Sequence, residues 1–121
     1  MKEYNSVSEP FLADVRAVVG DANVFTEPEK LEQYKTDEEY DPRRFRVPEA
    51  VVRPANAEEI AAVVKLCNKY NVPLTVRSGG TSLADGAIAV CGGIVLLMER
   101  LNKIIEMNTE AMYVVAEAGV R

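Results

Sequence analysis

The order of segments in the middle of the chain constrains the fold more than any other feature. Residues 51–53, Val-Val-Arg, predict a short strand that Pro54 closes, because proline cannot donate a ladder hydrogen bond. Asn56 is placed to cap the helix that follows. The apolar stripe of this helix consists of Ile60, Val63, Val64, Cys67 and Tyr70. Residues 74–76 are the next apolar run, and a strand, a helix and a strand of this length predict a right-handed parallel βαβ unit.

The remaining segments complete a small α/β (α+β) fold. Residues 9–19 carry an apolar stripe and are followed by Gly20, so they predict a first helix, and residues 27–34 predict a second, short one. Residues 94–98 are continuously apolar, which is typical of a strand buried on both faces. Residues 112–117 predict a fourth strand in which one face can be core. We expect a small, mainly parallel sheet with flanking helices.

A charged connector separates the first helices from the predicted sheet. Residues 36–46 are mostly charged and have no apolar period, so we expect them to be exposed. The arginines Arg43, Arg44 and Arg46 are expected in a solvated loop, paired with the acidic run at residues 37–39. The chain thus divides into an N-terminal helical segment with its connector, residues 1–47, and a second segment, residues 48–121.

Residues 77–87, Arg-Ser-Gly-Gly-Thr-Ser-Leu-Ala-Asp-Gly-Ala, indicate a phosphate loop at the carboxyl end of a parallel strand, where open α/β sheets place their ligands. Small residues let backbone N–H groups approach an anion, and Thr81 and Ser82 add hydroxyl donors. A Walker-type loop is excluded because no lysine lies between Lys69 and Lys103. The glycine spacing also fails the Gly-x-Gly-x-x-Gly fingerprint. A plain glycine-rich turn stays open as the alternative.

Composition excludes several function classes. A net charge of −5 argues against nonspecific nucleic-acid binding. The chain has no histidine, which removes His-based metal sites and Ser-His-Asp triads. Cys67 and Cys91 form no Cys-x-x-Cys pair, so we expect neither zinc nor a disulfide, but free buried thiols. No run approaches the ~20 apolar residues of a membrane helix, so we expect no membrane span and a cytoplasmic location.

Four motifs together resemble a known family. They are Pro-Glu-Ala-Val-Val-Arg-Pro at 48–54, Asn-Val-Pro-Leu-Thr-Val-Arg at 71–77, the glycine loop at 77–87, and Gly-Gly-Ile-Val-Leu at 92–96. Their order and spacing resemble the N-terminal part of FAD-linked oxidases of the vanillyl-alcohol oxidase type, which carry a PCMH-type FAD-binding domain. Within that group the chain is most similar to the branch of the glycolate oxidase D-subunit and D-lactate dehydrogenase. The resemblance covers residues 48–120 well and the preceding segment more loosely.

The resemblance implies a cofactor site in the glycine loop. In the family this loop wraps the FAD pyrophosphate with backbone amides. The corresponding candidates are Ser78, Gly79, Gly80, Thr81, Ser82, Gly86 and Ala87. The family's loop that matches residues 117–120 returns close to the flavin, which makes Gly119 and Val120 secondary candidates, with a plain strand-ending turn as the alternative.

Three positions depart from the family's pattern. Ser78 stands where many relatives have glycine. Thr81 stands where some relatives carry a flavin-linking histidine, so the resemblance implies noncovalent FAD. Asp85 stands where many relatives have a small neutral residue. Because its carboxylate would repel a pyrophosphate, we expect it to point to solvent or to cap a turn.

The resemblance implies a segment of a flavin-dependent oxidoreductase that oxidises a 2-hydroxy acid such as glycolate or D-lactate. No catalytic acid or base and no metal ligand is expected in these 121 residues. We expect an N-terminal fragment, inactive alone, whose partners are FAD and the C-terminal half of the enzyme. The alternative is a noncatalytic binding or interaction module that keeps only the fold and can self-associate through an unfinished sheet edge.

Overall fold

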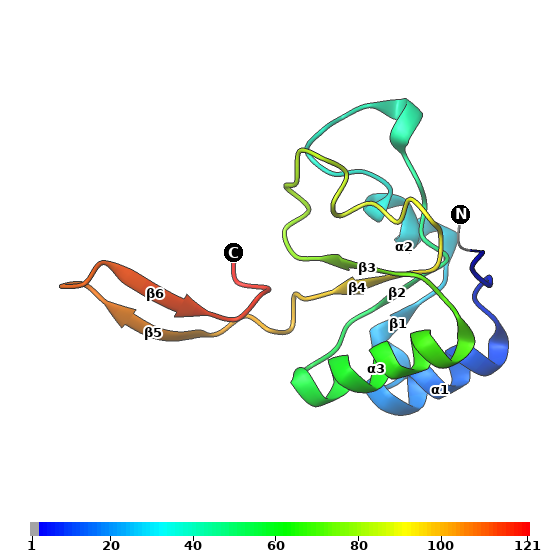
Figure 1. Cartoon of the computed structure of the whole chain (residues 1–121), viewed down its shortest axis with the longest axis horizontal. Helices are drawn as coiled ribbons and strands as arrows, with labels where there is room; N and C mark the ends of the chain where they lie inside the picture. The colour runs from blue at the N-terminus through cyan, green and yellow to red at the C-terminus, as the bar shows by residue number, and fades with distance from the viewer. Residues whose placement is uncertain (1–2) are drawn as a thin grey trace.

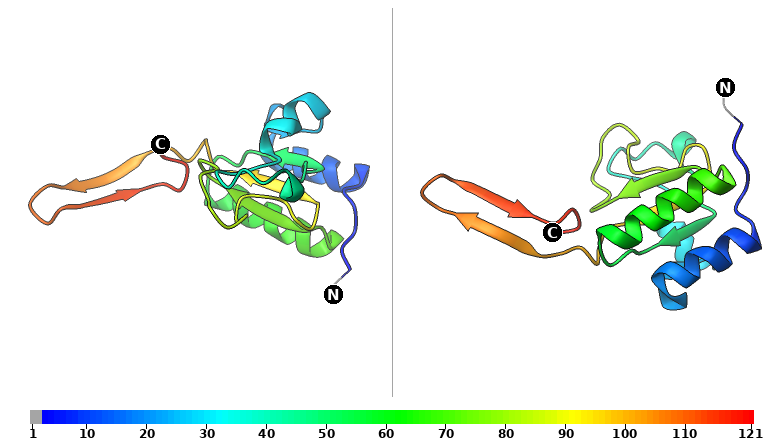
Figure 2. Two further views of the ribbon diagram at one scale, coloured as in Figure 1. Left: turned by 90° about the horizontal axis from the view of Figure 1, so that it is seen from above. Right: turned by 60° about the horizontal axis from the view of Figure 1, so that its bottom comes forward.

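The computed structural model describes residues 3–121 as an α/β body from which a β-hairpin extends (Figure 1). The two views of Figure 2 show the same separation, with the hairpin leaving the body at the end that carries the carboxyl ends of the parallel strands. Within the described residues, no helix is long and apolar enough to cross a membrane.

Two long helices cover one face of the sheet. Helix α1, Glu9–Val19, is capped by the Ser8 hydroxyl, which accepts from the backbone N–H of Phe11, and it ends at Gly20 with a φ of 88°. In helix α3, Ala57–Tyr70, the Asn56 side chain accepts from the N–H of Glu59 at 2.9 Å. The helices predicted at residues 9–19 and after Asn56 are therefore confirmed.

The main sheet has four strands in the order β1-β2-β4-β3. They are β1, Val24–Phe25; β2, Ala50–Val52; β4, Ile94–Leu97; and β3, Leu74–Arg77. Strands β2, β4 and β3 are parallel, whereas β1 pairs antiparallel with β2. The predicted mainly parallel sheet is confirmed, with β4 between the two strands that α3 connects. The short strand β1 was not predicted.

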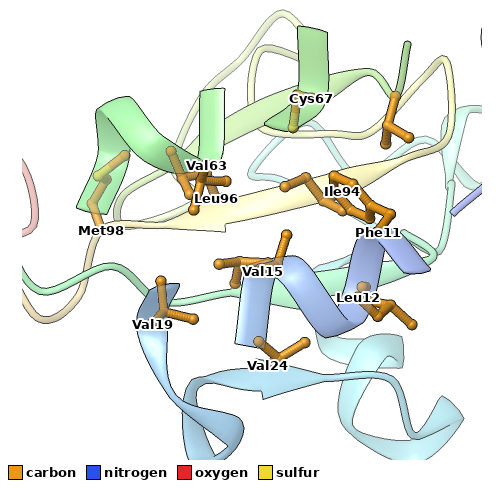
Figure 3. Close-up of a cluster of buried hydrophobic side chains, with 13 residues drawn as sticks. Phe11, Leu12, Val15, Val19, Val24, Val63, Cys67, Ile94, Leu96 and Met98 are labelled. Carbon is orange, nitrogen blue, oxygen red and sulfur yellow. The ribbon is translucent and has the colours of Figure 1, made fainter. Parts of the chain in front are cut away.

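The core lies on both faces of β4. Ile94 and Leu96 belong to the cluster that the two helices cover, together with Phe11 and Val63 (Figure 3). Val95 and Leu97 belong to a second cluster on the opposite face. This alternation confirms that β4 is buried on both sides. The second cluster also contains Leu31, Val51 and Ala89, with Phe25 and Tyr34 packed against it.

The second predicted helix is two short turns. Helix α2 spans Pro28–Leu31, and a 3-10 helix follows at Glu32–Tyr34. Another 3-10 helix, Pro42–Arg44, lies in the charged connector.

The hairpin corrects one prediction. Strands β5, Ile104–Asn108, and β6, Tyr113–Ala116, pair only with each other, and the whole of β6 is exposed. The strand predicted at residues 112–117 therefore exists, but neither of its faces is core. The two strands are linked by a turn in which Met112 has a φ of 54°. The hairpin has no third strand and no helix over it within residues 3–121.

Candidate functional site

The glycine loop forms a hollow at the carboxyl end of β3. Its volume is about 370 Å³. It is lined by Val76, Ser78, Gly79, Gly80, Thr81, Ser82, Gly86 and Ala87. Seven of these eight were predicted from the sequence to contact the cofactor, so the fold brings the seven candidates of the glycine loop to one surface.

The backbone N–H groups of the loop are free to donate. Among the described residues, none of the N–H groups of residues 78–86 finds a protein acceptor, and the next one, of Ala87, donates to the Ser82 hydroxyl at 3.2 Å. Backbone donors that lack protein partners bind either water or an anion. A run of such donors around a hollow matches the chemistry of a phosphate group.

Gly79 and Gly80 are required for different reasons. Gly80 has a φ of 74°, and a Cβ added there would lie 2.3 Å from Nη2 of Arg77. Gly79 has no positive φ, and its added Cβ would meet only the Thr81 side chain at 3.8 Å. Gly80 therefore maintains the shape of the loop, whereas Gly79 leaves its exposed side open to a ligand.

Ser82 is held by the connector and is not a free donor. Its hydroxyl donates to Oδ2 of Asp37 at 2.6 Å, and its carbonyl accepts from the N–H of Glu38 at 3.2 Å. Asp37 is only 7% exposed, and its other oxygen accepts from the N–H of Glu39 at 3.0 Å. The expectation that residues 36–46 form a wholly exposed connector is wrong at Asp37, because its carboxylate anchors the glycine loop.

The other two hydroxyls of the loop differ from each other. The Ser78 hydroxyl donates to the carbonyl of Ala118 at 2.6 Å, which links the loop to the end of the hairpin. The Thr81 side chain is exposed and has no hydrogen-bond partner among the described residues. Thr81 is thus the one hydroxyl of the three that a ligand meets without displacing a protein contact.

Arg44 and Asp85 form a second link between the connector and the loop. The guanidinium of Arg44 pairs with Oδ2 of Asp85, whose side chain is only 16% exposed. Asp85 has a φ of 59°, a conformation that Asp tolerates better than most residues. The expectation that this carboxylate points to solvent is therefore wrong.

The predicted pairing of the arginines with the acidic run at residues 37–39 is wrong as well. Arg43 pairs instead with Asp41, and its hydrogen bonds lower the pKa of Asp41 to about 2.

Gly119 and Val120 border a second, neighbouring hollow. Gly119 is buried, its N–H donates to the carbonyl of Leu101 at 2.8 Å, and an added Cβ would lie 1.8 Å from the carbonyl oxygen of Met98. Gly119 is therefore a packing glycine. Val120 lines the hollow, whose volume is about 520 Å³. Its other lining residues are Glu99, Asn102, Ile104, Gly119 and Arg121.

Sequence reasoning missed the groups behind the loop. Arg77 Nη1 donates to the carbonyl of Thr36 at 2.7 Å and to that of Ala87 at 3.3 Å, and its Cζ lies over the ring of Tyr34, 5.6 Å from the centroid. Burial, followed by the charge of Glu99, raises the pKa of Tyr34. The signal that could have found this group is an arginine directly before a glycine loop, with no acidic neighbour in sequence.

The residues around the glycine loop define a candidate ligand-binding site. Within residues 3–121, no group of three or more acidic or cysteine side chains could hold a metal ion. An α/β body with free loop amides at the carboxyl end of a parallel sheet belongs to the class of phosphate-binding domains of nucleotide cofactors. Residues 48–121 match the family described as the FAD binding domain, and the chain belongs to that family. FAD is its cofactor, and the free loop amides suit a pyrophosphate.

The chain is similar to proteins that are named as oxidoreductases. The glycolate oxidase subunit GlcD of Bacillus subtilis is 34% identical over 79 residues, which are 65% of this chain and 17% of that protein. A probable mitochondrial D-lactate dehydrogenase of Danio rerio is 31% identical over 112 residues, which are 93% of this chain and 22% of that one. The crystal structure of p-cresol methylhydroxylase with substrate bound has a TM-score of 0.76 at 27% identity, covering 94% of this chain and 23% of that chain.

The chain therefore spans about a fifth of the length of these relatives. The resemblance to FAD-linked oxidases that the motifs implied is confirmed, and so is the α/β fold class.

Proposed function

We propose that this chain holds the pyrophosphate of FAD, without a covalent bond, through the backbone N–H groups of residues 78–82. The observation that carries the proposal is the run of donors over residues 78–86 that have no protein acceptor among the described residues. Gly86 and Ala87 close the far side of the same hollow. Val120 would contact the cofactor from the neighbouring hollow, with Gly119 fixing its backbone.

The whole protein would be an FAD-dependent oxidoreductase for a 2-hydroxy acid such as glycolate or D-lactate. Bound flavin would supply the acceptor for a hydride from the substrate carbon. The residues of this chain would bind and orient the cofactor, and among the described residues those that line the glycine-loop hollow carry no carboxylate or amine. The support for the substrate class is the similarity to the glycolate oxidase subunit and the D-lactate dehydrogenase.

Gly79→Val tests the binding proposal. The new side chain would stand on the ligand side of the loop, since little protein lies there. We expect FAD affinity to fall at least tenfold, about 1.4 kcal/mol, while the melting temperature stays close to that of the unchanged chain. The readout is equilibrium dialysis against FAD.

Ala84→Val is the matched control, because Ala84 is exposed in the same loop but does not line the hollow. It should bind FAD like the unchanged chain. A Gly79→Val variant with undiminished FAD affinity would remove the loop from the proposed site.

We propose as the second candidate a noncatalytic association module, and the exposed hairpin favours it. The apolar residues that β5, β6 and their turn leave exposed are Ile104, Ile105, Met107, Met112, Tyr113, Val114 and Val115. An isolated two-stranded hairpin is marginally stable in water, so pairing with a second copy would add the strands it lacks. Light scattering after size exclusion measures the mass of the unchanged chain and of the variant Val114→Lys. Association predicts an oligomer that the variant dissociates. A chain that is monomeric both with and without the substitution contradicts association.

A further inference from the structure

Arg77 is a half-buried cation without a carboxylate partner. No acidic oxygen among the described residues lies within ion-pair distance of its guanidinium, and Asp37, the carboxylate whose charge acts on Arg77, is engaged by Ser82. Its Nη1 donates to two backbone carbonyls, and its Cζ lies over the ring of Tyr34, 5.6 Å from the centroid. Arginine is almost never fully buried without an acidic partner, so a half-buried guanidinium that lacks one needs an explanation.

The guanidinium lies directly behind the glycine loop. A Cβ built on Gly80 would come within 2.3 Å of Nη2, 2.6 Å of Cζ and 2.9 Å of Nε of Arg77. The whole planar group therefore packs against the Gly80 backbone. Arg77 does not itself line the hollow, whereas its neighbour Val76 in β3 does, and successive side chains of a strand point to opposite faces.

The acidic side chains around Arg77 are already engaged, so a counter-ion for its guanidinium would have to bind in the hollow. Burial is the largest influence on the pKa of Arg77 and lowers it, whereas Asp37 and Tyr34 raise it and Arg121 lowers it. Asp85, the other acidic residue of the loop, is already paired with Arg44. An anion bound in the hollow would compensate the charge of Arg77, with only the backbone of the glycine loop between the two charges.

We propose that Arg77 is the positioning residue of the pyrophosphate site: it holds the loop in its donor conformation from behind and supplies the positive charge that the loop amides alone lack. This inference rests on the proposed function and adds to it the residue that supplies the positive charge opposite the pyrophosphate. This role accounts for a cation packed against Gly80. It also accounts for the hydrogen bonds from Arg77 to the carbonyls of Thr36 and Ala87, which hold the guanidinium in place.

The first test uses the unchanged chain. Labelled with 15N, it is titrated with FAD, with ADP and with riboflavin, while the Nε resonance of Arg77 and the amide resonances of residues 78–82 are followed. The Arg77 resonance should move with FAD and ADP, which carry a pyrophosphate, and stay fixed with riboflavin. If the loop amides respond to FAD while the Arg77 resonance does not move, this inference is overturned and the proposed function stands. If neither responds, the proposed function fails first.

The second test separates charge from packing. Arg77→Met removes the charge and keeps an apolar stem, whereas Arg77→Lys keeps the charge. Arg77→Met should lower FAD affinity about tenfold and make its salt dependence shallower, and Arg77→Lys should keep the salt dependence of the unchanged chain. A packing role alone would lower the melting temperature of both variants and leave the salt dependence unmoved. Equal salt dependence in Arg77→Met and the unchanged chain contradicts the inference.

Discussion

At the residue scale, the two cysteines have opposite environments. Cys67 is 6% exposed on the buried side of α3, which confirms the prediction from its helical spacing. Cys91 is exposed, so the prediction that it is buried is wrong. Cys91 lies in the turn that precedes β4, where no helical period constrained its position. Burial raises the pKa of the Cys67 thiol to about 11.

The two thiols should therefore react at very different rates. We expect a thiol reagent at neutral pH to modify Cys91 rapidly and Cys67 only when the chain unfolds, because the thiolate is the reactive form. Mass spectrometry of the labelled peptides measures both rates. The helix phase would have to be revised if Cys67 reacted as fast as Cys91.

Cys67 also predicts a pH dependence of stability. Its pKa is raised in the folded state, so unfolding favours the thiolate once the pH passes the ordinary value of 9.0. The contribution of Cys67 is thus fully present below pH 9 and is lost as the pH rises toward about 11. Cys67→Ala should cost on the order of 1 kcal/mol at pH 7 and flatten this alkaline loss. Urea unfolding at a series of pH values provides the comparison, and an alkaline loss as steep in Cys67→Ala as in the unchanged chain would contradict it.

At the element scale, the connector and the glycine loop form one unit. Asp37 with Ser82, Arg44 with Asp85, and Arg77 with the carbonyl of Thr36 join them. Ser82→Ala removes the donor that satisfies Oδ2 of Asp37, which leaves a buried charged oxygen with one partner fewer. We expect a loss of about 1–3 kcal/mol in the free energy of unfolding.

Thr81→Ala is the control for this prediction, because its hydroxyl has no protein partner among the described residues. It should change stability by less than about 0.5 kcal/mol. Amide hydrogen exchange provides a second readout, since the Ala87 N–H donates to the Ser82 hydroxyl and should exchange faster only in Ser82→Ala. Equal stability of the two variants would show that the link between connector and loop is not energetically important.

The elements that local sequence determines could be predicted, and the contacts between distant elements could not. The first helix, α3 and β4 follow from periodicity and capping at neighbouring positions, and the glycine loop follows from residues 77–87 themselves. The burial of Asp37 depends on Ser82, 45 residues away, and no local pattern encodes it. Strand β5 was missed because residues 104–108 lack the period of a half-buried strand, as expected for a hairpin exposed on both faces.

At the scale of the whole molecule, the body and the hairpin make different contributions to the site. The sheet positions the glycine loop, and the connector holds the loop through Asp37, Arg44 and the carbonyl of Thr36. The hairpin returns the chain so that Ala118 accepts from the Ser78 hydroxyl, which brings the hollow beside Val120 next to the glycine loop. If the cofactor spans the glycine-loop hollow and the hollow beside Val120, the Ser78–Ala118 contact would hold its two binding surfaces together.

An amide NMR titration of the 15N-labelled chain with FAD tests directly whether the glycine loop binds the pyrophosphate. We expect the amide resonances of residues 78–82 to shift downfield in proportion to bound FAD, because these N–H groups exchange water for phosphate oxygens. Amides in α1 and at the tip of the hairpin should stay fixed, and riboflavin should not reproduce the loop shifts. FAD binding that leaves residues 78–82 unshifted, or equal loop shifts with riboflavin, would contradict pyrophosphate binding by this loop.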